Sequence, residues 1–209
     1  MKVKIKKIRK LDIKVKKYDI EVKNNHNFFA NNILMHNSTI YNNGYYHPRS
    51  VIDDGHKSRD WLKGFKAKLS YLIGENQRVC GENMYAEHSI KYDNLKSYFY
   101  IFNIWWKTES YDLCYNWDTV VALCKDWSTY LNEPVLHVPV LYDGKFDYDK
   151  IKEIYENLDY DKQEGIVCRT AHGFYYEQFQ THIAKAIRPK HITTDEHWSK
   201  TWKPNKLKK

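Results

Sequence analysis

The positive charge of this chain is concentrated at one end, and this asymmetry limits what the chain can fold into. Residues 1–37 carry ten basic and three acidic side chains, a net charge of +7, whereas residues 38–209 carry 24 basic and 23 acidic side chains, a net charge of +1. A basic balance over a whole protein favours a polyanion partner such as nucleic acid. Because the excess is local, the sequence instead predicts two unlike segments joined near residue 37.

The composition excludes several classes of protein. The chain contains 18 Tyr and 7 Trp, and 42% of its residues are hydrophobic, which excludes disorder for most of its length. No apolar run approaches the roughly 18 residues of a membrane helix, and the Lys-rich start lacks the apolar core of a signal peptide. The cysteines are scattered without a C-x-x-C pair, at Cys80, Cys114, Cys124 and Cys168. This spacing argues against a zinc ribbon or a disulfide framework and favours a reducing, cytoplasmic location without a membrane partner.

The hydrophobic periodicity predicts an α+β protein with a short all-β beginning. Residues 2–7 alternate polar and apolar side chains, and residues 28–30 precede the turn-forming pair Asn31-Asn32, so residues 1–37 read as short strands, too few to form a core alone. The remaining elements are a hairpin at Asn42-Asn43-Gly44, helices at 59–72, 117–131 and 147–158, strands at 78–84, 97–106 and 135–141, and a buried strand at 164–169.

The first segment contains short sequence blocks in a fixed order. They read Tyr-Asp-x-x-Val, then a histidine, then Phe-x-Ala-Asn, then His-Asn before a hydroxyl residue. These blocks lie at Tyr18 to Val22, His26, Phe28 to Asn31 and His36-Asn37-Ser38. In this order they resemble the C-terminal part of an intein, and the resemblance covers residues 1–37. It implies a short segment that completes a Hint-type β fold.

The resemblance also implies roles for five residues. Asn37 would attack its own main-chain carbonyl, form a succinimide and cut the bond to Ser38. Ser38 would accept the upstream acyl group and pass it to its own amine. His36 and His26 would act as acids or bases, and Asp19 would assist these steps.

An intact intein also needs an N-terminal part with its own nucleophile and histidine block. The sequence begins only 37 residues before the junction, so the resemblance implies a split intein whose larger N-terminal piece is another chain. The positive charge of residues 1–37 would hold an acidic partner half, more weakly at high salt. The structural alternative is a basic β arm in which His26 and His36 are ordinary surface residues.

The second segment contains another ordered set of blocks. They are His47-Pro48-Arg49-Ser50, Ser58 to Trp61, Arg78 to Ala86, Tyr98 to Trp105, Glu164 to Val167, and Ala184 to Pro189 with His191 to Trp198. Together they resemble the ATP-dependent RNA ligases of the covalent nucleotidyltransferase superfamily, particularly the phage type. The resemblance covers nearly all of residues 38–209 and implies an ATP-grasp-like adenylation domain with antiparallel sheets, which uses ATP and Mg²⁺ to seal RNA ends.

The match of blocks assigns the candidate ligase residues. Lys185 corresponds to the late lysine that contacts the α-phosphate of ATP. Glu82 and Glu164 correspond to carboxylates that contact the ribose or hold a divalent metal. Phe102 lies where an aromatic ring flanks adenine. By spacing alone, Phe102 is equally a core residue, Lys185 is a solvated lysine, and Glu164 caps a strand end or pairs with Arg169.

Two arginines complete the candidate set. Arg49 and Arg59 correspond to basic positions near the AMP or the RNA end, where bidentate phosphate recognition favours arginine. From the residues alone, Arg59 followed by Asp60 is equally a surface charge pair.

The sequence departs from the ligase family at two points. The late motif often reads Lys-x-Lys, but Ile187 occupies the second position, and Arg188 is the candidate for supplying the charge. More importantly, the nucleophile motif Lys-x-Asp-Gly is absent, and Ser38 corresponds to the residue that follows it. The two resemblances thus meet at Ser38. They imply that trans-splicing joins the missing nucleophile, carried by an N-terminal partner chain, to Ser38.

Two other functions fit parts of the sequence. The first is a non-catalytic RNA-binding module that uses the basic arm and exposed aromatic rings. The second is a DNA ligase or capping enzyme, which the residues from His191 to Trp198 disfavour because they look RNA-ligase-like.

Overall fold

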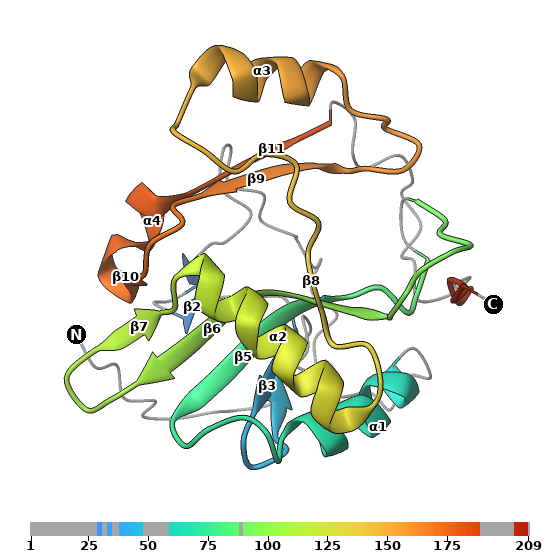
Figure 1. Ribbon diagram of the computed structural model, residues 1–209, viewed down its shortest axis with the longest axis vertical. Helices are drawn as coiled ribbons and strands as arrows, with labels where there is room; N and C mark the ends of the chain where they lie inside the picture. Colours follow the sequence, from blue (N-terminus) through green and yellow to red (C-terminus); the bar gives the residue numbers. More distant parts are fainter. Residues whose placement is uncertain are drawn as a thin grey trace, which may run out of the picture.

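The computed structural model describes residues 29–30, 33–34, 38–47, 59–87, 90–188 and 203–208. Its main element is a seven-stranded sheet with the order β10-β7-β6-β5-β3-β4, in which neighbours run antiparallel and β8 pairs in parallel with β6 (Figure 1). The strands are β3 (Ser38–Tyr41), β4 (Tyr46–His47), β5 (Gln77–Asn83), β6 (Phe99–Lys107), β7 (Asp112–Cys114), β8 (Leu136–His137) and β10 (Phe174–Tyr175). The mixed helix and antiparallel-sheet architecture confirms the predicted α+β class.

Two helices cover one face of this sheet, α1 (Asp60–Leu69) and α2 (Trp117–Leu131). The helix α2 begins where Asn116 caps it, since its side chain accepts a 2.8 Å hydrogen bond from the Thr119 amide, and it ends at Asn132 in the left-handed conformation. The bounds of α2 are those that the periodicity predicts. On both helices, apolar side chains three or four residues apart face the sheet.

The two faces of the main sheet carry different cores. Alternation along the strands turns Val79 toward the helices and Cys80 to the opposite side. The first core lies between the sheet and the two helices, and its fully buried members include Ile40, Leu62, Leu69, Val79, Ile104 and Val120. The second core lies on the other face and is built from Cys80, Trp105, Cys114 and Phe174, with Phe179 and Ile183 packed against it.

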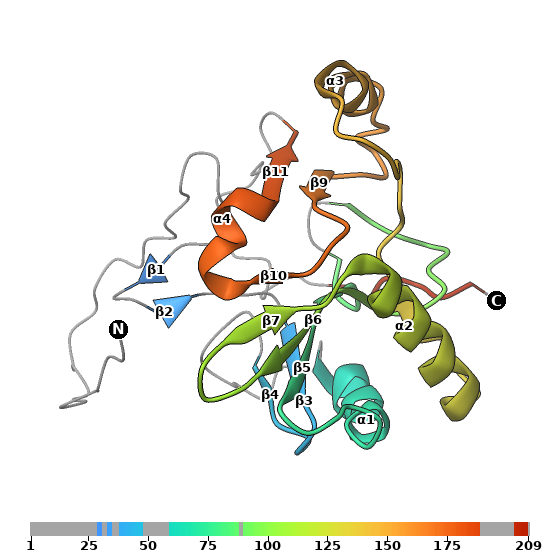
Figure 2. The ribbon, with the colours of Figure 1, turned by 60° about the vertical axis from the view of Figure 1, so that its left-hand side comes forward.

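A two-stranded antiparallel sheet lies beyond the second core, β9 (Gly165–Arg169) paired with β11 (Ile183–Ile187) (Figure 2). A 3₁₀ turn and α4 (Phe179–His182) lead into β11, and α3 (Tyr148–Glu156) lies next to this small sheet. The hydroxyl of Tyr155 on α3 donates a 2.6 Å hydrogen bond to the Ile187 carbonyl.

Two predicted strands differ from those observed. The strand at 164–169 was expected to be buried, but it lies in the small peripheral sheet, and Val167 is 58% exposed. The strand at 135–141 is limited to Leu136–His137, which pair with Tyr100 and Ile101. Pro139 lacks the amide hydrogen that a longer pairing would need.

Little of the first segment lies within the described residues. β1 (Phe29–Ala30) pairs antiparallel with β2 (Ile33–Leu34), which agrees with short strands on either side of Asn31-Asn32. The candidates outside the described residues are Asp19, His26, His36, Asn37 and Arg49. Within the described ranges, no helix has the length and apolar character to cross a membrane.

Candidate functional site

Glu82 and Phe102 lie on neighbouring strands, β5 and β6. Glu82 is two residues after Cys80, so alternation directs it to the second-core face. Phe102 sits at a β-bulge, because Cys80 pairs with Asn103 and Gly81 with Ile101, which leaves Phe102 as the extra residue. The ring of Phe102 is half-buried and packs against the second core. Bulges commonly re-aim a side chain beside a functional site.

Gly81, the residue before Glu82, is constrained by its neighbours. A Cβ at this position would lie 2.5 Å from the Phe99 ring and 2.8 Å from the Tyr100 carbonyl oxygen. The close approach of β6 to β5 therefore requires glycine here, and it fixes the backbone from which Glu82 projects.

Glu164 and Lys185 both belong to the small sheet, three register positions apart. Glu164 immediately precedes β9, and its carbonyl accepts a 2.9 Å hydrogen bond from the Arg188 amide at the end of β11. Lys185 lies on β11 opposite Val167 and is exposed. A Cβ at Gly165 would collide with the Ala186 carbonyl, so the tight β9–β11 contact needs this glycine.

Tyr92 connects the two parts of the site. Its hydroxyl donates a 3.1 Å hydrogen bond to the Lys162 carbonyl. Burial is the main cause that raises the pKa of Tyr92 to about 12; the charges of Glu164 and Glu82 contribute to this rise, and Arg188 opposes it. The hydroxyl of this loop residue thus reaches the segment just before Glu164. The sequence blocks did not include Tyr92, since nothing in its local pattern signals this placement.

Arg188 is anchored beside Glu164. One terminal nitrogen donates a 2.7 Å hydrogen bond to the Tyr160 carbonyl, and its buried Nε has no hydrogen-bond partner among the described residues. The adjacent Ile187 is half-buried and pairs with Gly165. A positive charge is thus present next to the position where the family pattern expects its second lysine.

Arg169 links the small sheet to the main sheet. It donates hydrogen bonds to the Phe102 carbonyl at 3.0 Å, to Asn103 Oδ1 at 2.5 Å and to the Tyr115 carbonyl at 2.9 Å. Its guanidinium also lies 5.3 Å from the Trp117 ring centroid. Burial lowers the pKa of Arg169. This side chain therefore sets the spacing between the two sheets.

A second arginine stabilises the same face. Arg78 forms a bidentate pair with Asp112, with nitrogen–oxygen distances of 2.8 and 2.7 Å, and lies 5.0 Å from the Trp105 ring centroid. The second core is therefore flanked by two arginines with fixed partners, Arg78 and Arg169.

The remaining described candidates are Arg59 and Ser38. Arg59, directly before α1, is only 9% exposed, while Asp60 pairs with Lys63 at 3.1 Å, so the interpretation of Arg59 as a surface charge is wrong. Ser38 is the first residue of β3, is 7% exposed and pairs with Gly81. The predicted junction thus lies on the strand beside Glu82.

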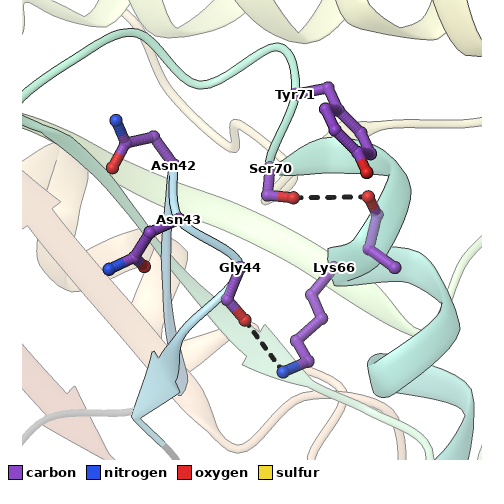
Figure 3. A pocket seen from close by; sticks show the side chains of 7 residues that line it. Asn42, Asn43, Gly44, Lys66, Ser70 and Tyr71 are labelled. Carbon is purple, nitrogen blue, oxygen red and sulfur yellow. Dashed lines mark hydrogen bonds between the residues drawn. The ribbon is translucent and has the colours of Figure 1, made fainter.

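A shallow hollow of about 430 Å³ lies elsewhere, between α1 and the β3–β4 hairpin (Figure 3). Lys66 faces this hollow, but its ammonium donates a 2.9 Å hydrogen bond to the Gly44 carbonyl and lies 4.5 Å from the Tyr46 ring centroid. None of the described candidate residues lines it. Lys66 joins the hairpin to the helix, whereas Asn43 and Ser70 form hydrogen bonds within their own elements.

Comparison with known proteins identifies the family. A profile described as RNA ligase matches residues 24–187, well over half of the chain. The match includes β5, β6, β9 and β11 and the described candidate residues other than Arg188, which directly follows it. Searches of curated proteins and of solved structures find no match. The chain therefore belongs to the RNA ligase family.

Proposed function

We propose that residues 38–209 are the C-terminal portion of an ATP-dependent RNA ligase that seals RNA ends through enzyme-AMP and RNA-adenylate intermediates. The observation that carries this proposal is the small sheet, in which Glu164 directly precedes β9, the Arg188 amide donates a 2.9 Å hydrogen bond to the Glu164 carbonyl, and Lys185 lies on β11. Phosphoryl and nucleotidyl transfer depend mainly on positioning phosphates and on stabilising developing charge. Family membership supports the same chemistry.

The described residues fit a nucleotide. Phe102 offers a partly exposed aromatic ring, which suits stacking against a base. Lys185 offers an exposed ammonium for the α-phosphate, where it would stabilise the charge that develops during transfer. ATP supplies the AMP group that is transferred. The carboxylate of Glu82 would orient the ribose or a metal ion.

The described residues also fit Mg²⁺. They contain no group of three or more metal-binding side chains, but Mg²⁺ usually takes one or two carboxylates together with substrate phosphates. Glu82 and Glu164 would supply these carboxylates, and the ion would neutralise phosphate charge. The Tyr92 hydroxyl donates its hydrogen to the Lys162 carbonyl, two residues before Glu164, and would help to fix the segment that leads to this carboxylate.

The second part of the proposal concerns residues 1–37. We infer that they are a split-intein fragment, in which Asn37 and Ser38 perform the splicing steps with help from His36, His26 and Asp19. The position of the intein-like junction supports this inference, since Asn37 directly precedes Ser38, which corresponds to the residue that follows the ligase nucleophile motif. The partner would be an N-terminal chain ending in this motif and an intein half.

Labelled ATP tests the proposal. The purified chain alone should retain no covalent AMP, and AMP on the isolated chain would overturn the split-enzyme proposal. After mixing with an N-terminal chain of the expected kind, mass spectrometry should detect a spliced product that becomes labelled. Asn37→Ala should block release of residues 38–209 after mixing, and unchanged release would remove Asn37 from the mechanism.

Substitutions in the ligase portion separate the two activities. In the spliced enzyme, Lys185→Ala should lower the rate of AMP labelling by about a hundredfold, as expected for losing one charge-stabilising group, without changing the yield of splicing. Lys125→Ala, an exposed lysine on α2, is the matched control and should label normally. Normal labelling of Lys185→Ala would contradict the assignment.

A further inference from the structure

The segment of residues 203–208, called the strap below, is fixed against the loop that follows Glu82. Asn205 is 2% exposed, and its side chain forms three hydrogen bonds with the backbone of this loop. Its Nδ2 donates to the Met84 carbonyl at 2.8 Å and to the Ala86 carbonyl at 3.3 Å, and its Oδ1 accepts from the Tyr92 amide at 2.8 Å. A buried amide with this many partners holds a single orientation.

The backbone of the strap is bound on both sides. The Asn205 amide donates to the Tyr85 carbonyl at 2.9 Å, and the Tyr98 hydroxyl donates to the Asn205 carbonyl at 2.9 Å. Bridges pair Ala86 with Pro204 and Leu95 with Leu207. Figures 1 and 2 both show the dark-red strap beside the green loop. The strap is therefore a fixed part of the structure next to the candidate site.

The strap and the loop present lysines to the solvent. We call five of them the lysine surface: Lys91, Lys96, Lys203, Lys206 and Lys208, all exposed. The acidic groups on the same two segments are Glu87 and Asp93, and Asp93 lies 3.0 Å from Lys91 and 3.9 Å from Lys206. Five lysines against two carboxylates leave a local charge of +3, although residues 38–209 together carry only +1.

This surface adjoins the residues assigned to nucleotidyl transfer. Tyr92 lies in the loop between Lys91 and Asp93, its amide donates to Asn205 Oδ1, and its hydroxyl donates to the carbonyl of Lys162, two residues before Glu164. A polyanion bound along the lysine surface would therefore reach the candidate site. Phosphate contacts of this kind set the position and orientation of a nucleic acid strand.

We propose that the lysine surface binds the phosphate backbone of single-stranded RNA and presents its end to the site. The choice of RNA as the ligand rests on the proposed ligase function. Asn205 acts as a positioning residue, because it holds three of the five lysines beside the other two. Binding through lysines on exposed positions is sensitive to salt, since each phosphate contact releases a counterion.

A salt titration of RNA binding tests the proposal. The full chain is mixed with a fluorescein-labelled 20-nucleotide oligouridylate, and anisotropy is measured at several salt concentrations. The triple variant K96E/K206E/K208E should bind at least about tenfold more weakly at low salt, and the slope of log affinity against log salt should fall by about 2, near 0.7 for each lost contact. The basic residues 1–37 are unchanged and contribute the same background to every measurement.

The matched control is K125E/K145E/K152E, which changes the net charge equally at exposed positions on α2, on α3 and before α3. It should change the affinity by less than twofold. Equal weakening by both triple variants, or no weakening by the first, would overturn the proposal. Asn205→Ala should also weaken binding, and unchanged binding would overturn the role of Asn205. Failure of AMP labelling in the spliced enzyme would instead overturn the ligase function and leave the RNA result standing.

Discussion

The two faces of the main sheet are covered by different kinds of side-chain contact. On the helix face, α1 and α2 bury hydrophobic side chains at regular spacing, and shape and area account for the contact. On the other face, four buried residues are supplemented by Arg169, by the Arg78–Asp112 pair and by aromatic rings at their edges. The difference separates a face that stabilises the fold from one that holds charged groups in place.

The largest expected change in the free energy of unfolding is for a substitution on the helix face. Ile104→Ala removes three carbon atoms from a fully buried position and should lower the free energy of unfolding by about 3 kcal/mol, through lost burial and a residual cavity. Urea denaturation measures this value. Val140→Ala, at an exposed position, should cost less than about 0.5 kcal/mol. A similar loss in both variants would show that the helix face does not dominate stability.

Arg169→Leu tests the charged face. It leaves the carbonyls of Phe102 and Tyr115 and the side chain of Asn103 without their donor, so the free energy of unfolding should fall by about 2 kcal/mol. Amide hydrogen exchange should accelerate in β9 and β11 before it does in α2. Equally accelerated amide exchange in α2 would mean that the two faces of the main sheet unfold as one unit, which would contradict the difference between them.

Of these substitutions, Tyr92→Phe is expected to change stability at neutral pH the least. The folded pKa of Tyr92, about 12, exceeds the ordinary value of 10.0, so the fold favours the neutral phenol. The resulting stabilisation is complete below pH 10 and is lost as the pH rises through 12. Tyr92→Phe should therefore reduce the loss of thermal stability in that range.

Tyr71→Phe is the control for this measurement, because Tyr71 is 89% exposed and should leave the alkaline profile unchanged. An unchanged profile for Tyr92→Phe would show that Tyr92 is not held neutral by its surroundings.

The same comparison explains what the sequence could predict. The helix α2 and the β3–β4 hairpin depend on local spacing, caps and turn residues, and both were predicted correctly. The edge strand β10 and its neighbour β7 were missed, because pairing between Cys114 and Phe174 joins residues far apart in the chain. The exposure of Val167 was also missed, since an apolar run in the sequence does not show whether another element packs against that strand.

The site divides in the same manner. Glu82, Glu164 and Lys185 could be nominated from block order, and their catalytic roles stay predictions. The bulge at Phe102, the link through Arg169 and the place of Tyr92 depend on contacts between distant segments, which no local pattern encodes. Block order could therefore nominate candidate residues for the chemistry, but it could not nominate the residues that hold them in place.

The burial of Ser38 has a consequence for the order of events at the proposed junction. Ser38 is only 7% exposed at the start of β3, in register with Gly81. A product that began at Ser38 would place a free α-ammonium group at this desolvated position, at a cost of several kcal/mol unless β3 detached. Cleavage before Ser38 without joining to the N-terminal partner would thus leave β3 frayed beside Glu82. An uncharged peptide bond at Ser38 would instead let β3 pair with β5. A joined product and a merely released one would therefore differ in the pairing of β3.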